Sequence, residues 1–436
     1  MLASLVADLT RTVPDAVPPG TLPVRGQMVQ MDRTNGEWSI DPTLTFLNHG
    51  SYGAVPRAAL KHQADLRTRL ERDPVRFYKT DLEPLLDEMR SRLGSLLNCR
   101  PSDLAPLPNA TIALCTILQN TRLEPGDEIL ITDHEYQSLS NELERVVART
   151  GAVVVRASFP FPISDPAVVT ERFLGCLSPR TRIAFISHIT SCTSLVFPVA
   201  EIVRECNRRG IDICVDGAHS PGQVPVDIAA LKPTYFVFSG HKWLSGPKGT
   251  GFLYVRSDRQ VGFRPLQISS RAHKVRPERA LFLRDFDYQG TADYSGVLTV
   301  PVAAECMGRL LPGGWPALMR QNHELIMKGR GILASALADI PGCCVETAPE
   351  RMIGCMITII VPEPPEALAN RPTNYDDALQ DALFERHRIV TPVWRFGATN
   401  ARVVRVSAQV YNTPSQFEHL GDALAEELAR EAAGRA

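Results

Sequence analysis

Residues 211–219 read Ile-Asp-Ile-Cys-Val-Asp-Gly-Ala-His, and residues 235–243 read Tyr-Phe-Val-Phe-Ser-Gly-His-Lys-Trp. Each stretch is a short apolar run that ends in polar residues and a turn. Helix-like segments such as 140–149 and 199–209 separate runs of this kind. Further runs lie at 128–132, 152–157, 182–187 and 251–255. Apolar strands that alternate with helices indicate βαβ units and a parallel sheet covered on both faces.

The segments on either side of this alternation have other patterns. Residues 1–43 are rich in proline, arginine and polar residues, and we expect an N-terminal arm. Residues 44–300 form the predicted large α/β domain, and residues 301–436 a smaller α+β domain. The elements expected outside the alternation are helices at roughly 57–71, 82–97, 315–337 and 415–431 and apolar strands at 356–361 and 403–406.

The composition excludes several classes of protein. A balance of 47 Lys+Arg against 48 Asp+Glu argues against nucleic-acid binding. No run of about 18 uncharged apolar residues could span a membrane, and the N-terminus lacks the basic region of a signal peptide. The ten cysteines form no C-x-x-C pair. We expect them to be buried reduced thiols and the protein to be cytoplasmic.

Three polar features follow predicted strands or begin a helix. Lys242 lies after an apolar strand, where burial would make a lysine neutral and nucleophilic, although most lysines are solvated. Asp216 ends another strand and needs a cation or donor if it is buried, unless it only caps the next turn. Ala110 and Thr111 begin a helix whose free N–H groups suit phosphate. Open α/β sheets bind their ligands at such strand ends.

Taken together, these features resemble the class V aminotransferases, which are fold type I enzymes that use pyridoxal 5′-phosphate. The chain is most similar to the isopenicillin N epimerase-like branch. The resemblance covers about residues 44–430 and implies a mainly parallel seven-stranded sheet with a small C-terminal domain. It rests on the motifs Leu47–Gly53 (LNHGSYG), Thr132–Tyr136 (TDHEY), Ser187–Ser191 (SHITS), Val215–Gln223 (VDGAHSPGQ), Gly240–Trp243 (GHKW), Arg405–Ser407 (RVS) and Tyr411–Thr413 (YNT).

The resemblance implies a role for each residue that would face the cofactor ring. Lys242 would form the Schiff base with the cofactor and then move protons at the substrate Cα. Asp216 would pair with the pyridinium nitrogen and so maintain the ring as an electron sink. His219 would hydrogen-bond the ring oxygen. Tyr136 would stack on the ring, with His134 as a rival for that position.

Other matched positions imply binding of the cofactor phosphate. Ala110 and Thr111 would donate to it, joined by Ser239 and His241. Thr291 would reach the phosphate bound by a neighbouring subunit. The resemblance therefore implies a homodimer with composite active sites.

The substrate side of the site follows from the same resemblance. Arg405 would hold the α-carboxylate of an amino-acid substrate in a bidentate grip, and Asn48 would lie close enough to touch substrate. Ser191 stands near the cofactor oxygen, where many members have Asn. Cysteine desulfurases of this class carry a catalytic cysteine shortly before the arginine motif, but residues 389–402 contain none. Persulfide chemistry is therefore not expected.

These roles predict removal of an α-proton from an amino acid or an amino-acid-derived substrate through a Schiff base with the cofactor. Epimerisation is the outcome that the branch suggests. β-Elimination at a C–S bond of a cysteine-derived substrate starts from the same carbanion, and transamination is a third outcome. Tyr136, His49, His188 and Tyr52 are candidates for a second acid or base, although each could equally be structural.

Two other classes of function fit the sequence less well than an enzyme does. A silent binding protein on the same fold would not need Lys242, Asp216 and Arg405 together. A metalloenzyme would need histidines at ligand spacing, and here they are scattered. No metal is therefore predicted.

Overall fold

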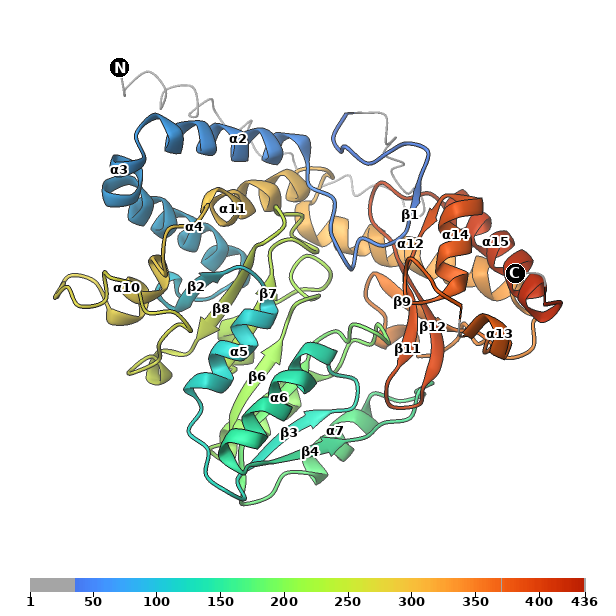
Figure 1. The fold of residues 1–436 in the computed structure, drawn as a ribbon, viewed down its shortest axis with the longest axis horizontal. Coiled ribbons are helices and arrows are strands. Elements are labelled where there is room, and N and C mark those ends of the chain that lie inside the picture. Colours follow the sequence, from blue (N-terminus) through green and yellow to red (C-terminus); the bar gives the residue numbers. More distant parts are fainter. Residues whose placement is uncertain (1–35, 370, 435–436) are drawn as a thin grey trace, which may run out of the picture. The chain divides into compact units, whose positions relative to one another are not determined.

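Seven strands form the central sheet of the computed structural model, which describes residues 36–369 and 371–434 (Figure 1). In sheet order they are β2 (Leu104–Leu107), β8 (Gly251–Val255), β7 (Tyr235–Ser239), β6 (Asp212–Asp216), β5 (Thr181–Ser187), β3 (Glu128–Thr132) and β4 (Val153–Ala157). Neighbouring strands from β7 to β4 are parallel, whereas β8 is antiparallel to both β7 and β2. The prediction of a mainly parallel α/β sheet is confirmed.

Strand β2 was not expected from the sequence. It contains Pro106, which cannot donate a backbone hydrogen bond and is therefore tolerated only at an edge or a bulge. The structure places β2 at the edge of the sheet, where it pairs with β8 alone. The other six strands lie within one or two residues of the predicted runs.

Side chains of the sheet alternate between two apolar cores, one on each face. On β5, Ile183 and Phe185 belong to one core, while Ala184 and Ile186 belong to the other. The first core is closed by α5 (Ala110–Asn120), α6 (Gln137–Thr150) and α10 (Leu281–Asp287). The second is closed by α4 (Leu82–Leu97), α7 (Ala167–Gly175), α8 (Val199–Arg208), α9 (Ile228–Leu231) and α11 (Ser295–Gly308). Burial on both faces explains why the middle residues of β5, β6 and β7 are apolar.

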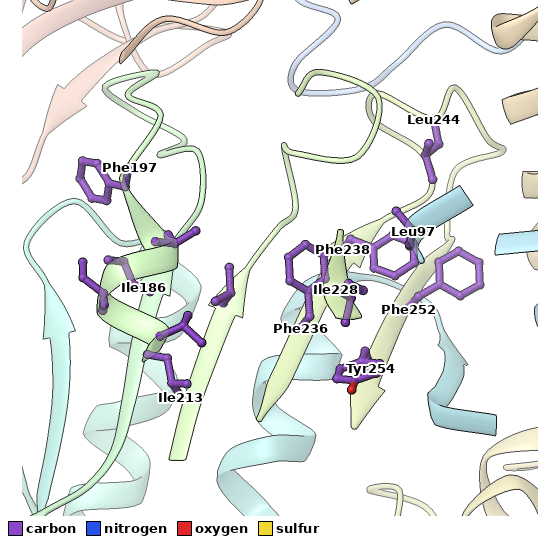
Figure 2. Packing of buried hydrophobic residues seen from close by; sticks show 14 of the residues in the cluster. Leu97, Ile186, Phe197, Ile213, Ile228, Phe236, Phe238, Leu244, Phe252 and Tyr254 are labelled. Carbon is purple, nitrogen blue, oxygen red and sulfur yellow. The ribbon is translucent and has the colours of Figure 1, made fainter. Parts of the chain in front are cut away.

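Figure 2 shows the second core where Phe236 and Phe238 of β7 lie beside Phe252 and Tyr254 of β8. The rings of Phe238 and Phe252 are stacked, with centroids 4.9 Å apart. Leu97, at the end of α4, packs into the same cluster. This packing fixes the end of β7, from which the chain turns into the segment that carries the predicted lysine.

A second, smaller sheet lies in the C-terminal part of the chain. Its antiparallel order is β11 (Val393–Phe396), β12 (Ala401–Ser407) and β9 (Met356–Ile360). The helices of this part are α12 (Gly314–Ala336), α13 (Glu366–Ala369), α14 (Ala378–His387) and α15 (Pro414–Ala432). α12 packs against α15 and α15 against α14.

The segment that precedes the central sheet in the sequence pairs with a strand of this C-terminal part. Strand β1 (Thr45–Phe46) pairs in parallel with β10 (Ile389–Val390). The remaining elements are α2 (Arg57–Arg72), α3 (Pro74–Arg76), a π-helical turn (Phe77–Asp81) and 3₁₀ turns at Pro101–Asp103, Ser257–Arg259 and Glu350–Met352. The LNHGSYG motif directly follows β1, so the pairing of β1 with β10 places this motif close to the motif that begins at Arg405.

Residues 1–35, which make up most of the expected N-terminal arm, lie outside the described residues. The described residues belong to one compact unit, and the domain division at residue 300 stays a prediction. In the part of the chain that the structure describes, no helix combines the length and apolar character needed to cross a bilayer. All ten cysteines lie within this part and are free thiols. The cytoplasmic location stays a prediction.

Candidate active site

A cavity of about 190 Å³ lies where β5, β6 and β7 end, and it gathers most of the predicted site residues. Parallel strands end at the same edge of a sheet, so residues that follow different strands converge there. The predicted residues in its lining are Ala110, Thr111, Tyr136, Ser191, Asp216, His219, Ser239, His241, Lys242 and Arg405.

Lys242 lies in the turn after β7, and its Nζ is 3.0 Å from His219 Nε2. The Trp243 indole N–H donates to His219 Nδ1 at 3.4 Å. An indole nitrogen can only donate, so the proton of the neutral His219 ring is on Nε2 and faces the lysine. Burial lowers the pKa of His219 well below its usual value and the pKa of Lys242 to about 8. The lowered pKa of Lys242 raises the fraction of the neutral, nucleophilic amine, while His219 stays uncharged.

Asp216 ends β6 and is almost completely buried. Within residues 36–369 and 371–434, its carboxylate receives a single hydrogen bond, from the Ala218 N–H to Oδ1 at 2.9 Å. Burial raises the pKa of Asp216, while the Ala218 hydrogen bond and the charge of Lys242 oppose the shift. A protonated nitrogen in the cavity would supply the counter-charge that this carboxylate lacks.

The start of α5 supplies the third feature. Asn109 caps the helix, because its Oδ1 accepts from the Ile112 N–H at 2.9 Å. Ala110 and Thr111 line the cavity at the first turn, where helical N–H groups have no intrahelical acceptor. A Cβ on Gly251 would lie 2.5 Å from the Asn109 Cα. The glycine therefore lets β8 approach the helix start closely.

Ser239 and His241 complete this end of the cavity. His241 Nδ1 is 2.8 Å from the Thr250 carbonyl oxygen. A carbonyl can only accept, so Nδ1 carries a proton and the ring orientation is fixed. A helix N-terminus beside hydroxyl and imidazole groups can hold an anion such as phosphate.

Arg405 on β12 is 1% exposed and is held by several groups. Its Nη1 donates to Ser191 O at 2.9 Å and Ser191 Oγ at 3.3 Å. Its Nη2 donates to Asn48 Oδ1 at 3.3 Å and Ser51 Oγ at 2.5 Å. The guanidinium carbon lies 4.8 Å from the centre of the Trp394 ring, within the range of a cation–π contact. Burial lowers its pKa to about 10, so it stays charged at neutral pH.

The Arg405 Nε is buried and has no hydrogen-bond partner among the described residues. A fixed guanidinium with a free donor is suited to a carboxylate. Asn48 is outside the lining of the cavity and reaches the site through Arg405.

The structure separates Tyr136 from its rival His134. Tyr136 is half-exposed, and its ring centre lies 6.0 Å from Lys242 Nζ in the cavity. His134 is buried outside this cavity, with Nδ1 2.8 Å from Thr193 Oγ1 and its ring 4.5 Å from that of Phe396. This geometry favours Tyr136 as the residue beside the cofactor ring.

Thr291 is not part of this cavity. It is exposed, its Oγ1 lies 2.9 Å from the Tyr288 hydroxyl, and it lines a separate surface hollow. Its role in the site of a neighbouring subunit stays a prediction.

The candidates for a second acid or base divide into two groups. Tyr52 and Tyr136 line the cavity. His49 does not line it and is buried with Nδ1 2.7 Å from the Tyr411 hydroxyl, and burial lowers its pKa to about 3. His188 is also outside the lining, and burial lowers its pKa to about 4. Both histidines stay neutral at physiological pH.

Two residues near the site were not expected. Glu135 accepts hydrogen bonds from Ser187 N at 3.0 Å, Ser187 Oγ at 2.6 Å and Thr132 Oγ1 at 2.7 Å. It therefore ties the end of β3 to β5 beside Asp216, and burial raises its pKa to about 7. A glutamate three residues after a buried strand was the available signal. For Trp394, no local pattern distinguished it from an ordinary core residue.

The residues present fit pyridoxal 5′-phosphate. A nucleophilic lysine suits its aldehyde, an under-paired aspartate suits its ring nitrogen, and the start of α5 suits its phosphate. The charged guanidinium of Arg405, which lines the cavity, fits the carboxylate of an amino acid beside it. The fold and cavity thus define a pyridoxal-phosphate enzyme built on an open, mainly parallel sheet.

Comparison with known proteins agrees with this class. The model of the family Aminotransferase class-V matches residues 75–420. An isopenicillin N epimerase of Streptomyces clavuligerus is 33% identical, over 90% of this chain and 97% of its own. A probable chloroplastic L-cysteine desulfhydrase of Arabidopsis thaliana is 30% identical, over 88% and 83% respectively. The chain belongs to the class V aminotransferase family, and its cofactor is pyridoxal phosphate.

The fold is shared with solved structures. A complex of a cystine C–S lyase with its reaction product cysteine persulfide superposes with a TM-score of 0.74 at 24% identity. The match covers 88% of this chain and 98% of the solved one.

Proposed function

We propose that the enzyme epimerises an amino acid or an amino-acid-derived substrate by removing its α-proton and returning a proton to the other side. The observation that carries the proposal is a single cavity shared by Lys242, Asp216 and Arg405. Two relatives named as isopenicillin N epimerases are 33% and 34% identical to this chain, and this similarity supports epimerisation as the leading candidate. C–S β-elimination is the second candidate, because other relatives are named as L-cysteine desulfhydrases.

Arg405 binds the substrate carboxylate with its charged guanidinium, which lines the cavity. Because Ser191, Asn48 and Ser51 already fix the guanidinium, the bound carboxylate sets the direction of the Cα–H bond. When bound, the cofactor supplies an electron sink that stabilises negative charge at Cα, and Asp216 retains the ring proton on which that sink depends.

Lys242 removes the proton from Cα, since its lowered pKa leaves an appreciable neutral fraction near neutral pH. Tyr136 faces Lys242 within the cavity, with 6.0 Å between Nζ and the ring centre. We assign it contact with the ring and delivery of a proton on the side opposite the lysine. Tyr52 is the alternative donor because it also lines the cavity.

The test measures exchange of the α-proton with D₂O for a panel of L- and D-amino acids, together with release of pyruvate and ammonia. Exchange with inversion is expected. In Tyr136→Phe we expect exchange to continue while inversion falls at least about tenfold, as when one positioned acid or base is removed. Tyr375→Phe, at an exposed tyrosine outside the cavity, is the matched control.

Other outcomes identify other reactions. Pyruvate and ammonia without inversion would replace the epimerase proposal with the lyase. Stoichiometric conversion of the cofactor to its amine form would indicate transamination. A purified protein that is colourless and takes up no cofactor would contradict every form of the proposal.

We also propose a two-fold dimer with composite sites. Thr291 is exposed outside its own cavity, which suits a residue that serves a neighbouring subunit. A mass measurement on the active holoenzyme should give twice the chain mass of 48.0 kDa, and an active, cofactor-loaded monomer would contradict the dimer.

A further inference from the structure

Trp243 directly follows the lysine of the active site, and its side chain is completely buried. It packs in a small apolar cluster with Ile189 and Met356, and its ring centre lies 5.0 Å from that of His49. A phenylalanine could make most of these apolar contacts. It would lack the indole N–H, however, which donates to His219 Nδ1 at 3.4 Å.

His219 lies between this indole and the amine of Lys242. Its Nδ1 faces the Trp243 N–H, and its Nε2 is 3.0 Å from Lys242 Nζ. Burial lowers the pKa of His219 well below its usual value, so the ring carries one proton. Because Nδ1 must accept from the indole, that proton is on Nε2. His219 therefore presents a donor to the amine.

The tautomer of His219 determines which form of the amine it stabilises. A neutral amine has a lone pair that can accept from the Nε2–H. An ammonium group has only donors, so it would meet another donor at this position. In the opposite tautomer, Nε2 would be an acceptor and would stabilise the ammonium form. The proton on Nε2 therefore favours the neutral amine of Lys242.

Burial is the main reason why the pKa of Lys242 is lowered, and charged groups on other elements modify this effect. Asp216 at the end of β6 raises the pKa, whereas Arg405 on β12 lowers it. Tyr136, just before α6, presents its ring at 6.0 Å from Nζ. The histidine that faces the lysine also has Arg405 and His241 nearby. Among the described residues the indole N–H donates to this histidine alone, so the tautomer is the contribution that the indole controls.

The same tautomer suits the cofactor. The residues of the site fit pyridoxal phosphate, and the family resemblance places His219 beside its ring oxygen. A ring oxygen that has lost its proton can only accept a hydrogen bond, so it also requires the proton on Nε2. A proton on Nδ1 would instead direct the lone pair of Nε2 at this oxygen.

We propose that Trp243 is a positioning residue that fixes the tautomer of His219, and that His219 in this tautomer keeps the amine of Lys242 neutral. Trp243 is outside the lining of the active-site cavity, so it acts through His219. The inference rests on the proposed function in one respect, because that function makes Lys242 the residue that bonds the cofactor and removes the α-proton.

The experiment measures how the rate of cofactor uptake by the full-length apoprotein depends on pH. In the unmodified protein we expect the half-maximal rate near pH 8. Trp243→Phe removes the N–H, so His219 can carry its proton on Nδ1 and accept from the ammonium group. The midpoint should rise by about one pH unit, as expected from the net contribution of one hydrogen bond. The pH dependence of α-proton exchange by the holoenzyme should shift in the same direction.

Trp38→Phe is the matched control. Trp38 is also buried, but its indole N–H has no hydrogen-bond partner among the described residues. This substitution makes the same change in ring size without the loss of a hydrogen bond. It should leave the midpoint unchanged, and a shift equal to that of Trp243→Phe would show that the midpoint reports packing only.

A double-mutant cycle tests whether the indole acts through His219. In a His219→Leu background, which has no ring nitrogen, addition of Trp243→Phe should move the midpoint no further. The tautomer itself can be measured in the unmodified holoenzyme by ¹⁵N NMR of labelled histidines, which distinguishes protonated from unprotonated ring nitrogens. The signal of His219 is the one that disappears in His219→Leu, and we expect its proton on Nε2.

The outcomes separate this inference from the proposed reaction. A His219 protonated on Nδ1 in the unmodified protein, an unchanged midpoint in Trp243→Phe, or an equal shift in the His219→Leu background would overturn the inference. If the midpoint shifts as expected but no amino acid exchanges its α-proton, the role of Trp243 stands and the proposed reaction is wrong.

Discussion

Gly53 offers a sharp test of how the catalytic lysine is positioned. Its N–H donates to the His241 carbonyl at 2.9 Å, so the LNHGSYG segment lies directly against the turn that carries Lys242. A Cβ at Gly53 would be 2.1 Å from the Lys242 carbonyl oxygen. Ordinary van der Waals contact begins at 3.4 Å, so Gly53→Ala must displace one of the two backbones by about 1.3 Å.

This displacement acts on activity more than on folding. A misplacement of about 1 Å in a reacting group costs roughly 100-fold in rate. Overpacking of a tight contact costs about 1–3 kcal/mol of the free energy of unfolding. We therefore expect Gly53→Ala to fold and load cofactor, but to exchange the α-proton about 100-fold more slowly than the unmodified enzyme.

The assay is α-proton exchange under saturating substrate, with cofactor content and thermal unfolding measured on the same samples. Gly331→Ala is the matched control, because it adds the same methyl group where no atom lies within 4 Å. An exchange rate for Gly53→Ala within about twofold of the control would refute the reasoning, since the contact would then not constrain the lysine.

The remaining predictions concern pH, substrate binding and stability. The pKa of Lys242 is lowered from 10.5 to about 8, so the fraction of neutral amine increases as the pH rises through 8. The rate of cofactor uptake by the apoprotein should therefore reach half its maximum near pH 8. A midpoint near pH 10 would contradict burial of the amine. Arg405→Lys replaces the planar guanidinium, whose several N–H groups bind a carboxylate, with a single ammonium group. KM should therefore rise about 10- to 100-fold with a smaller change in kcat. An unchanged KM would show that the substrate carboxylate binds elsewhere. Arg402 is fully buried and pairs with Glu431 at 2.7 Å, so Arg402→Met should lower the free energy of unfolding in denaturant titrations by about 3–5 kcal/mol. Arg430→Met, at an exposed ion pair, should lower it by less than about 1 kcal/mol. Equal costs for the two variants would show that the buried charge of Glu431 is not left unpaired.

Much of the sheet was predictable because its signals are local. Apolar runs with turns at their ends identified the strands from β3 to β8, since strands buried on both faces have few polar residues. Lys242 and Asp216 could be placed at strand ends for the same reason. Strand β2 was missed because its proline breaks the strand pattern, and that penalty disappears at the edge of a sheet.

The surroundings of the site were less predictable, because they depend on contacts between distant segments. Asn48 and Arg405 are 357 positions apart and meet only after β1 pairs with β10. Trp394 lies in a strand that the sequence did not indicate, so its contact with Arg405 could not be foreseen. His134 and Tyr136 are two positions apart, and only packing decided that one is buried among aromatic rings while the other faces the lysine.

The sequence by itself therefore determined the fold class, the family and the chemical groups of the site, because these depend on residue type and short-range spacing. The tertiary structure decided the charge states and the space around them. The lowered pKa of Lys242 and the raised pKa of Glu135 come from burial by segments far away in the chain. Tertiary packing also brings the Trp243 N–H to His219, a contact that no local pattern records.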